Sequence, residues 1–194
     1  SARAHASFAA AERGHAAAQH ALATAYFTGN GVPPDFDAAA SWMRKAASQG
    51  YAPAQSDLGE LYRLGLGVPT DYTQSLEWFR KAAEQGYAAA QFNVGTAYRD
   101  GRGVPWDLTQ AIGWFRRAAE QGDTDAEIEL ASANLLGYGV TRDPAQAAVW
   151  YRRAAEQGSI EASYRLGLLY ADGDGVERDV IEALEWLDVA TARS

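Results

Sequence analysis

The sequence predicts an all-α superhelical solenoid built from five helix-turn-helix repeats of 36 residues. A tryptophan recurs every 36 residues, and a glycine–valine pair, an aspartate and a further glycine recur at the same interval. The tryptophans are Trp42, Trp78, Trp114, Trp150 and Trp186. A fixed period of roughly 20 to 50 residues is the signature of stacked structural repeats. Because stacked repeats share one continuous core, we expect residues 1–194 to form a single domain.

The repeats are predicted to cover residues 14–49, 50–85, 86–121, 122–157 and 158–193. A half repeat, one helix over residues 1–13, precedes them. Its end, Ala10–Gly14, aligns with Ala82–Gly86 at the end of a later repeat.

The first helix of each repeat is predicted from apolar residues on one helical face, as in residues 52–63. A small residue, such as Gly59, recurs where a neighbouring helix must approach closely. Tyr62 and its equivalents are expected to bury the ring while the hydroxyl bonds to a loop. A glycine such as Gly65 then ends the helix in the left-handed conformation.

The second helix is predicted to begin after an aspartate that caps its N-terminus. These aspartates are Asp35, Asp71, Asp107, Asp143 and Asp179. Glutamine or glutamate follows three residues later in four repeats, which predicts reciprocal capping boxes. The repeated tryptophans of this helix are most simply explained as core residues. We expect truncating one to cost roughly 3–5 kcal/mol.

Composition excludes several classes of function. The formal net charge is -8, which disfavours nucleic-acid binding because such binding needs a basic surface. The chain has no cysteine, so thiolate metal sites and cysteine nucleophiles are impossible. No apolar run is long enough to span a membrane. No serine-nucleophile motif occurs either, so we predict no enzymatic activity, no cofactor and no metal.

Three other patterns favour structural roles. His5, His15 and His20 lack the spacing of a metal-binding pair. The acidic loop 172–179 lacks the register of a calcium loop. Repeated basic pairs such as Arg80–Lys81 stand four residues from Glu77 and Glu84, which predicts exposed ion pairs along the helix.

The repeated pattern resembles the Sel-one-like repeat, a relative of the tetratricopeptide repeat. Residues 90–122 carry it almost whole, from Ala90 through Tyr98, Gly103 and Trp114 to Gly122. The resemblance implies a right-handed superhelix that acts as a non-enzymatic protein-interaction scaffold. It also favours a bacterial periplasmic or secreted location. Asn134 departs from the pattern by replacing the tyrosine, and we expect Tyr138 to fill the resulting gap.

Binding residues are expected where the repeats differ. By likeness to tetratricopeptide repeats, variable positions of the first helices face a concave groove that would bind a partner protein or peptide. The alternative is that some of these side chains pack against the next repeat. The predicted groove residues are Phe27, Arg63, Phe92, Arg99, Ile128, Leu135, Tyr164 and Leu168. Apolar side chains with flanking arginines suit a peptide that carries acidic groups.

Two further hypotheses concern partners. Trp106 is the one tryptophan outside the 36-residue series, and in a loop it could stack on a sugar. The alternative function is therefore an envelope-associated factor that binds carbohydrate or peptidoglycan. The last helix lacks an obvious polar cap, so self-association through exposed terminal repeats is also possible.

Overall fold

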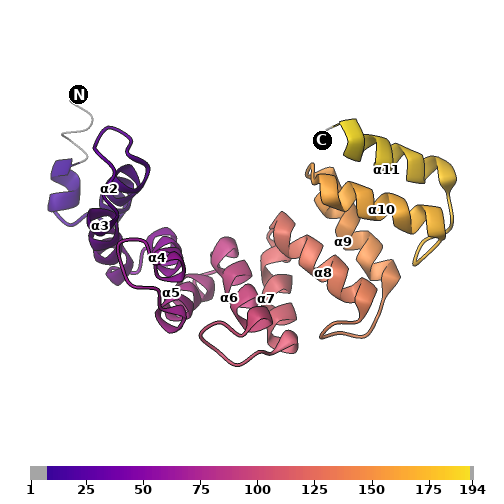
Figure 1. Cartoon of the computed structure of the whole chain (residues 1–194), viewed down its shortest axis with the longest axis horizontal. Coiled ribbons are helices and arrows are strands. Elements are labelled where there is room, and N and C mark those ends of the chain that lie inside the picture. The colour runs from indigo at the N-terminus through magenta and orange to yellow at the C-terminus, as the bar shows by residue number, and fades with distance from the viewer. Residues whose placement is uncertain (1–7, 193–194) are drawn as a thin grey trace. The chain divides into compact units, whose positions relative to one another are not determined.

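The computed structural model describes residues 8–192, which form helices joined by short loops, with no β-strand in that range (Figure 1). This confirms the predicted all-α fold. A helical stretch over residues 8–12 precedes α2, and Arg13, the last residue of the predicted N-terminal helix, lies in a turn. Residues 1–7 of that predicted helix, including His5, lie outside the described residues. Each later helix spans 13 residues. These helices are α2 (Ala16–Thr28), α3 (Phe36–Ser48), α4 (Ala52–Leu64), α5 (Tyr72–Glu84), α6 (Ala88–Asp100), α7 (Leu108–Glu120), α8 (Thr124–Leu136), α9 (Pro144–Glu156), α10 (Ile160–Asp172) and α11 (Val180–Ala192).

The chain divides into two compact units, one ending at Trp106 and the other beginning at Asp107. In the first unit, each of the helices α2 to α6 packs against the next along the chain. In the second unit, α7 to α11 do the same. The division falls within the third predicted repeat, between α6 and α7. A single domain over residues 1–194 stays a prediction.

Glycines end the first helix of every repeat. Gly29, Gly65, Gly101, Gly137 and Gly173 follow α2, α4, α6, α8 and α10 in the left-handed conformation, as expected. The second glycine of the loop has a different role. A Cβ atom on Gly103 would lie 2.2 Å from the backbone oxygen of Tyr72, in the preceding repeat. Glycine is required there because the two backbones touch, and Gly67 contacts Phe36 in the same way.

Aspartate caps the second helices, but the predicted capping boxes are incomplete. Asp71 Oδ1 accepts hydrogen bonds from the backbone N–H groups of Thr73 and Gln74. In a full box the Gln74 side chain would bond the Asp71 N–H. That N–H instead donates to the carbonyl of Tyr62, and the Gln74 amide bonds Glu77. The aspartate therefore ties the second helix to the end of the first.

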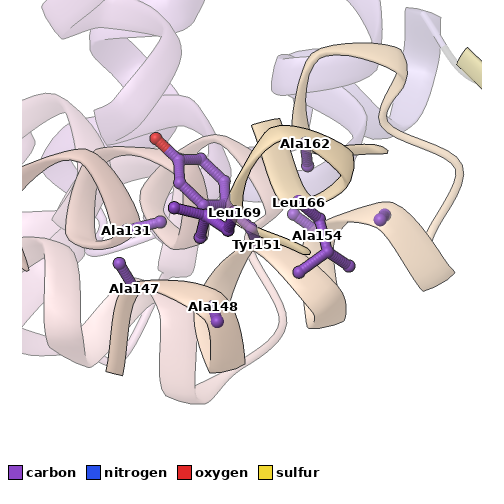
Figure 2. Close-up of a cluster of buried hydrophobic side chains, with 9 residues drawn as sticks. Ala131, Ala147, Ala148, Tyr151, Ala154, Ala162, Leu166 and Leu169 are labelled. Atoms are coloured by element: carbon purple, nitrogen blue, oxygen red, sulfur yellow. The ribbon is translucent and has the colours of Figure 1, made fainter. Parts of the chain in front are cut away.

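The core consists of many alanines and of several larger apolar side chains, such as Leu58, Leu76 and Phe79 in the second repeat. In the second unit Tyr151 is 1% exposed and packs with Ala131, Ala147 and Leu169 (Figure 2). Its hydroxyl lies 3.0 Å from Ser132 Oγ. In the first unit a glycine lets two helices approach closely, since a Cβ on Gly59 would lie 2.8 Å from the Phe79 ring.

Two expectations about the core need correction. The repeated tryptophans are half-buried rather than fully buried, and Trp78 and Trp150 pack against the edges of the two clusters. Tyr138 does not fill the space left by Asn134, because its side chain is 59% exposed. Asn134 satisfies its own buried amide by donating to the carbonyl of Leu130, at 2.7 Å. A short polar side chain can bond its own helix where a tyrosine would extend beyond it.

Candidate functional site

The repeated basic pairs contact aromatic rings, and Arg152 and Arg153 also pair with the carboxylates of Glu182 and Glu127. The second cation of each pair lies over the tryptophan three residues earlier on the same helix, as Lys81 does over Trp78 at 4.0 Å from the ring centre. The same contact is made by Lys45 with Trp42, Arg117 with Trp114 and Arg153 with Trp150. The predicted pairs Glu77–Lys81 and Arg80–Glu84 are not among the ion pairs of residues 8–192. Cation–π attraction and packing therefore explain this periodicity.

The first cation of the pair joins neighbouring repeats. Arg80 donates from Nη2 to the hydroxyl of Tyr98, at 2.7 Å, and its guanidinium lies 5.5 Å from that ring. Arg44 bonds Tyr62 and Arg152 bonds Tyr170 in the same way. The tyrosine hydroxyl therefore accepts a bond from the preceding repeat and not, as predicted, from its own loop.

A buried glutamine also joins successive repeats, which we did not expect from the sequence. Gln55, 5% exposed, donates from Nε2 to the carbonyl of Ala47 and accepts from Gln85 Nε2 at 2.7 Å. Gln19 and Gln91 bond the equivalent carbonyls, of Ala11 and Ala83. The recurrence of glutamine at 19, 55 and 91 could have predicted this contact, because a buried polar side chain usually has a hydrogen-bond partner.

Glu127 takes the place of this glutamine in the fourth repeat. Its side chain is fully buried, with Oε2 2.8 Å from Gln157 Nε2 and Oε1 3.2 Å from Arg153 Nε. Burial raises the pKa of Glu127, while Arg153 and Gln157 lower it by a smaller amount. An ionised carboxylate cannot donate a hydrogen bond as the glutamine amide does.

In the first unit, three of the four predicted groove residues line two cavities. Phe27, 38% exposed, packs edge-on against Phe36 and lines one cavity with Met43, Asp57 and Leu61. Arg63 and Phe92 line a second cavity between α4, α5 and α6.

The two predicted arginines of this unit already have acidic neighbours. Arg63 forms a bidentate pair with Glu60, one turn earlier on α4. That bond is the main cause that raises the pKa of Arg63. Arg99 donates from Nε to Asp100 at 2.8 Å and does not line either cavity. Both guanidinium groups are therefore already paired with a carboxylate before any partner binds.

In the second unit, the predicted residues differ in exposure. Ile128 and Leu135 are half-buried and pack against the core cluster of α8, α9 and α10, as the alternative interpretation holds. Leu168 is also half-buried, whereas Tyr164 is 49% exposed. Of the four predicted residues in this unit, Tyr164 is therefore the most accessible to a partner.

Other candidate residues fall outside these surfaces or have partners. His20 Nε2 lies 2.7 Å from Asp57 Oδ2, and its ring packs edge-on against Tyr51. Trp106 is 65% exposed in the loop that follows α6. Among the described residues, no three His, Asp or Glu side chains gather as metal ligands. None of the described helices is both long and apolar enough to cross a membrane.

The geometry defines a helical-repeat protein, in which an arginine of one repeat bonds a tyrosine of the next at three of the repeat junctions. The Sel1 repeat model matches five times, at residues 16–51, 52–87, 88–123, 124–159 and 160–193. The chain therefore belongs to the Sel1 repeat family, which confirms the resemblance. Sel1-repeat proteins are generally non-catalytic scaffolds for protein interaction. No protein in the search of curated sequences matches the chain.

Solved structures agree with this assignment. The chain is similar to c5321, a protective antigen of uropathogenic Escherichia coli with the same fold, at 41% identity and a TM-score of 0.95. It is also similar to a Sel1 repeat protein from Oxalobacter formigenes, at 35% identity and a TM-score of 0.88. The match covers 97% and 94% of this chain, but 40% and 75% of those two chains. The chain thus spans two fifths of the first relative's length.

Proposed function

We propose that the chain binds a partner protein or peptide through the exposed face of its first helices, without catalysis. The supporting observation is a contrast between positions. Residues that join the repeats recur every 36 residues, whereas the outer first-helix positions differ from repeat to repeat. A scaffold needs the recurring residues for its structure and the differing residues to recognise a particular partner.

Phe27 and Tyr164 would supply the principal contacts. Both are aromatic and more than a third exposed, at 38% and 49%. Aromatic anchors carry a large share of the binding energy in protein interfaces. Further contacts would come from Arg63, Phe92 and Arg99 in the first unit and from Ile128, Leu135 and Leu168 in the second. Because the helices are already packed, binding costs little ordering of the backbone.

The proposal is tested by capturing partners from the cells that make the protein. Tyr164→Asp and Phe27→Asp place a charge on the proposed face. Val149→Asp makes the same kind of change at a 51% exposed apolar position on α9, a second helix. We expect a partner that the wild type and Val149→Asp retain and that the two face variants lose. Equal capture by all four proteins would contradict the proposed face.

A second candidate function is carbohydrate binding by Trp106. An indole that is 65% exposed in a loop presents a flat apolar surface suited to a sugar ring. Titration with peptidoglycan fragments should then change tryptophan fluorescence in the wild type but not in Trp106→Ala. An unchanged response in Trp106→Ala would exclude this site.

A further inference from the structure

The last helix, α11, exposes an apolar side chain at a position that the other second helices bury. Leu184 is 56% exposed, whereas the equivalent residues of the four earlier repeats are at most 7% exposed. These equivalents are Ala40, Leu76, Ile112 and Ala148. Each belongs to a helix that packs against the first helix of the following repeat, as α9 does against α10 (Figure 1). No helix follows α11 among the described residues, so its equivalent surface is open to solvent.

Ile181 enlarges this surface in a way that the repeat itself does not require. Its side chain is 73% exposed. The earlier repeats also expose this position, but their residues there are polar or small: Asp37, Thr73, Thr109 and Ala145. Val180, 54% exposed, and Ile181 precede Leu184 by four and three residues, so all three lie close together on one side of the helix. An exposed apolar patch of this kind on a folded protein marks an interaction surface.

Arg178 lies just before α11 and has part of its guanidinium group unpaired. Its Nε donates to the carbonyl of Ala171 at 3.0 Å, as Arg142 Nε donates to the carbonyl of Leu135 one repeat earlier. Arg142 also donates from Nη2 to Asp174 of the following repeat, at 2.6 Å. Within residues 8–192, no carboxylate forms an ion pair with Arg178. The bond to Ala171 therefore holds Arg178 in place, while its two outer nitrogens can still bind an acid of another molecule.

The other end of the exposed surface carries a carboxylate without a partner. Asp188 takes the position at which three earlier repeats have an arginine that bonds a tyrosine of the next repeat, namely Arg44, Arg80 and Arg152. Its carboxylate forms no hydrogen bond or ion pair in the described part of the chain. Asp188 follows Leu184 by one helical turn and Arg178 by ten residues, which is about 15 Å along the helix. The apolar surface thus lies between a cation and an anion.

We propose that this surface of α11 binds the same surface of a second copy of the chain, with the two helices antiparallel about a two-fold axis. Leu184 of each copy then contacts Ile181 and Leu184 of the other. Arg178 of each copy meets Asp188 of the other, so both unpaired charges gain a partner. A second α11 fits because it carries an apolar centre, a cation at one end and an anion at the other, and the antiparallel direction matches opposite charges. In a two-fold dimer, one such patch serves both subunits.

The test is sedimentation equilibrium of the full chain over a wide range of concentrations. A contact made by one pair of helices is small beside the roughly 1,200–2,000 Å² that stable complexes bury, so the dimer is a weak one. We expect a reversible equilibrium between monomer and dimer with a Kd of about 10–500 µM. A monomer at every concentration up to about 1 mM would overturn the proposal. A series of larger assemblies would also overturn it, because a two-fold contact closes at the dimer.

A pair of apolar-to-polar variants assigns the contact to α11. Leu184→Gln removes an apolar side chain from both halves of the interface and should raise the Kd at least about tenfold. Val149→Gln is the matched control, because Val149 is a 51% exposed apolar residue on α9. It should dimerise like the wild type. Circular dichroism checks that both variants stay folded, as expected for exposed positions. Equal weakening by both variants, or by neither, would contradict an interface on α11.

Exchanging the two charges tests the antiparallel direction. Arg178→Glu and Asp188→Arg each place like charges together at both ends of the interface, so each should weaken the dimer. The double variant Arg178→Glu/Asp188→Arg restores opposite charges at both ends and should dimerise more tightly than either single variant. A double variant as weak as the single variants, or single variants that dimerise like the wild type, would overturn this arrangement.

This inference goes beyond the proposed function, because it uses none of the residues of the proposed partner-binding face. Leu184→Gln should therefore capture the same partner as the wild type while failing to dimerise. A wild type that stays monomeric, together with loss of capture in Leu184→Gln, would assign the surface of α11 to a partner protein and overturn the second copy as its occupant.

Discussion

Glu127 shows how one substitution changes an otherwise repeated contact. Gln55 both donates and accepts within the first unit, whereas an ionised Glu127 can only accept. Gln157 donates to Glu127 Oε2 and Arg153 forms an ion pair with Oε1, but Oε1 accepts no hydrogen bond, and burial raises the pKa of Glu127. A raised carboxyl pKa means that the folded protein favours the protonated form. Its contribution to stability is complete below the usual pKa and is lost as the pH rises through the raised value.

We therefore expect Glu127→Gln to stabilise the protein at neutral pH, by about 1 kcal/mol on the scale of one buried hydrogen bond. The stability gain over the wild type should shrink as the pH falls towards 4, because the protonated wild type resembles the glutamine variant. Thermal unfolding measured between pH 4 and pH 8 tests this. Gln55→Glu is the reciprocal control and should lose stability as the pH rises. A gain that does not vary with pH would contradict this explanation.

The contact between Arg80 and Tyr98 gives a second prediction for single residues. A double-mutant cycle with Arg80→Met and Tyr98→Phe should show a coupling of about 1 kcal/mol, since the bond is charge-assisted and the cation lies over the ring. Arg116→Met is the matched control. Arg116 is the equivalent of Arg80, but the next repeat carries Asn134 in place of the tyrosine. It should change the free energy of unfolding by less than about 0.5 kcal/mol. Additive effects of Arg80→Met and Tyr98→Phe would show that the bond contributes nothing.

At the scale of elements, the conformation of the loops depends more on close contact with the backbone of the preceding repeat than on side-chain contacts. Gly103 has a φ of +72° and lies against the Tyr72 carbonyl. Gly103→Ala should therefore cost about 2 kcal/mol or more, from backbone strain and displacement of α5. A Cβ on Gly113 in α7 would meet no atom within 4 Å, so Gly113→Ala should stabilise the protein by up to about 1 kcal/mol. Chemical unfolding of both variants tests this difference. Equal changes in the free energy of unfolding for Gly103→Ala and Gly113→Ala would contradict it.

Much of each element was predictable from local sequence. The glycine C-caps and aspartate N-caps were correct, because their conformations depend on a few neighbouring residues. The capping boxes were wrong because the Asp71 N–H has a better partner, the Tyr62 carbonyl, which only the folded loop brings near. The burial of Trp78 was also overestimated. A repeated tryptophan indicates a structural role, but the covering cation Lys81 shows that this role lies at the edge of the core.

For the molecule as a whole, the repeat period determined the family and the fold. Five matches to the Sel1 repeat in register leave little of the described chain unexplained. The candidate site was less predictable. Ile128 and Leu135 are partly packed into the core, whereas Asn93, Thr96 and Arg102 were not expected to line a cavity. Sequence periodicity identifies variable positions, but which of them a neighbouring repeat covers depends on the packing itself.

Amide hydrogen exchange on the chain with its captured partner bound is the sharpest test of binding through the first helices. Partner contact protects backbone amides of the elements it covers. We predict that exchange slows mainly in the first helices α2, α4, α6, α8 and α10, including the segments around Phe27 and Tyr164. Slowing confined to the second helices, or to the loop around Trp106, would contradict the proposed binding face.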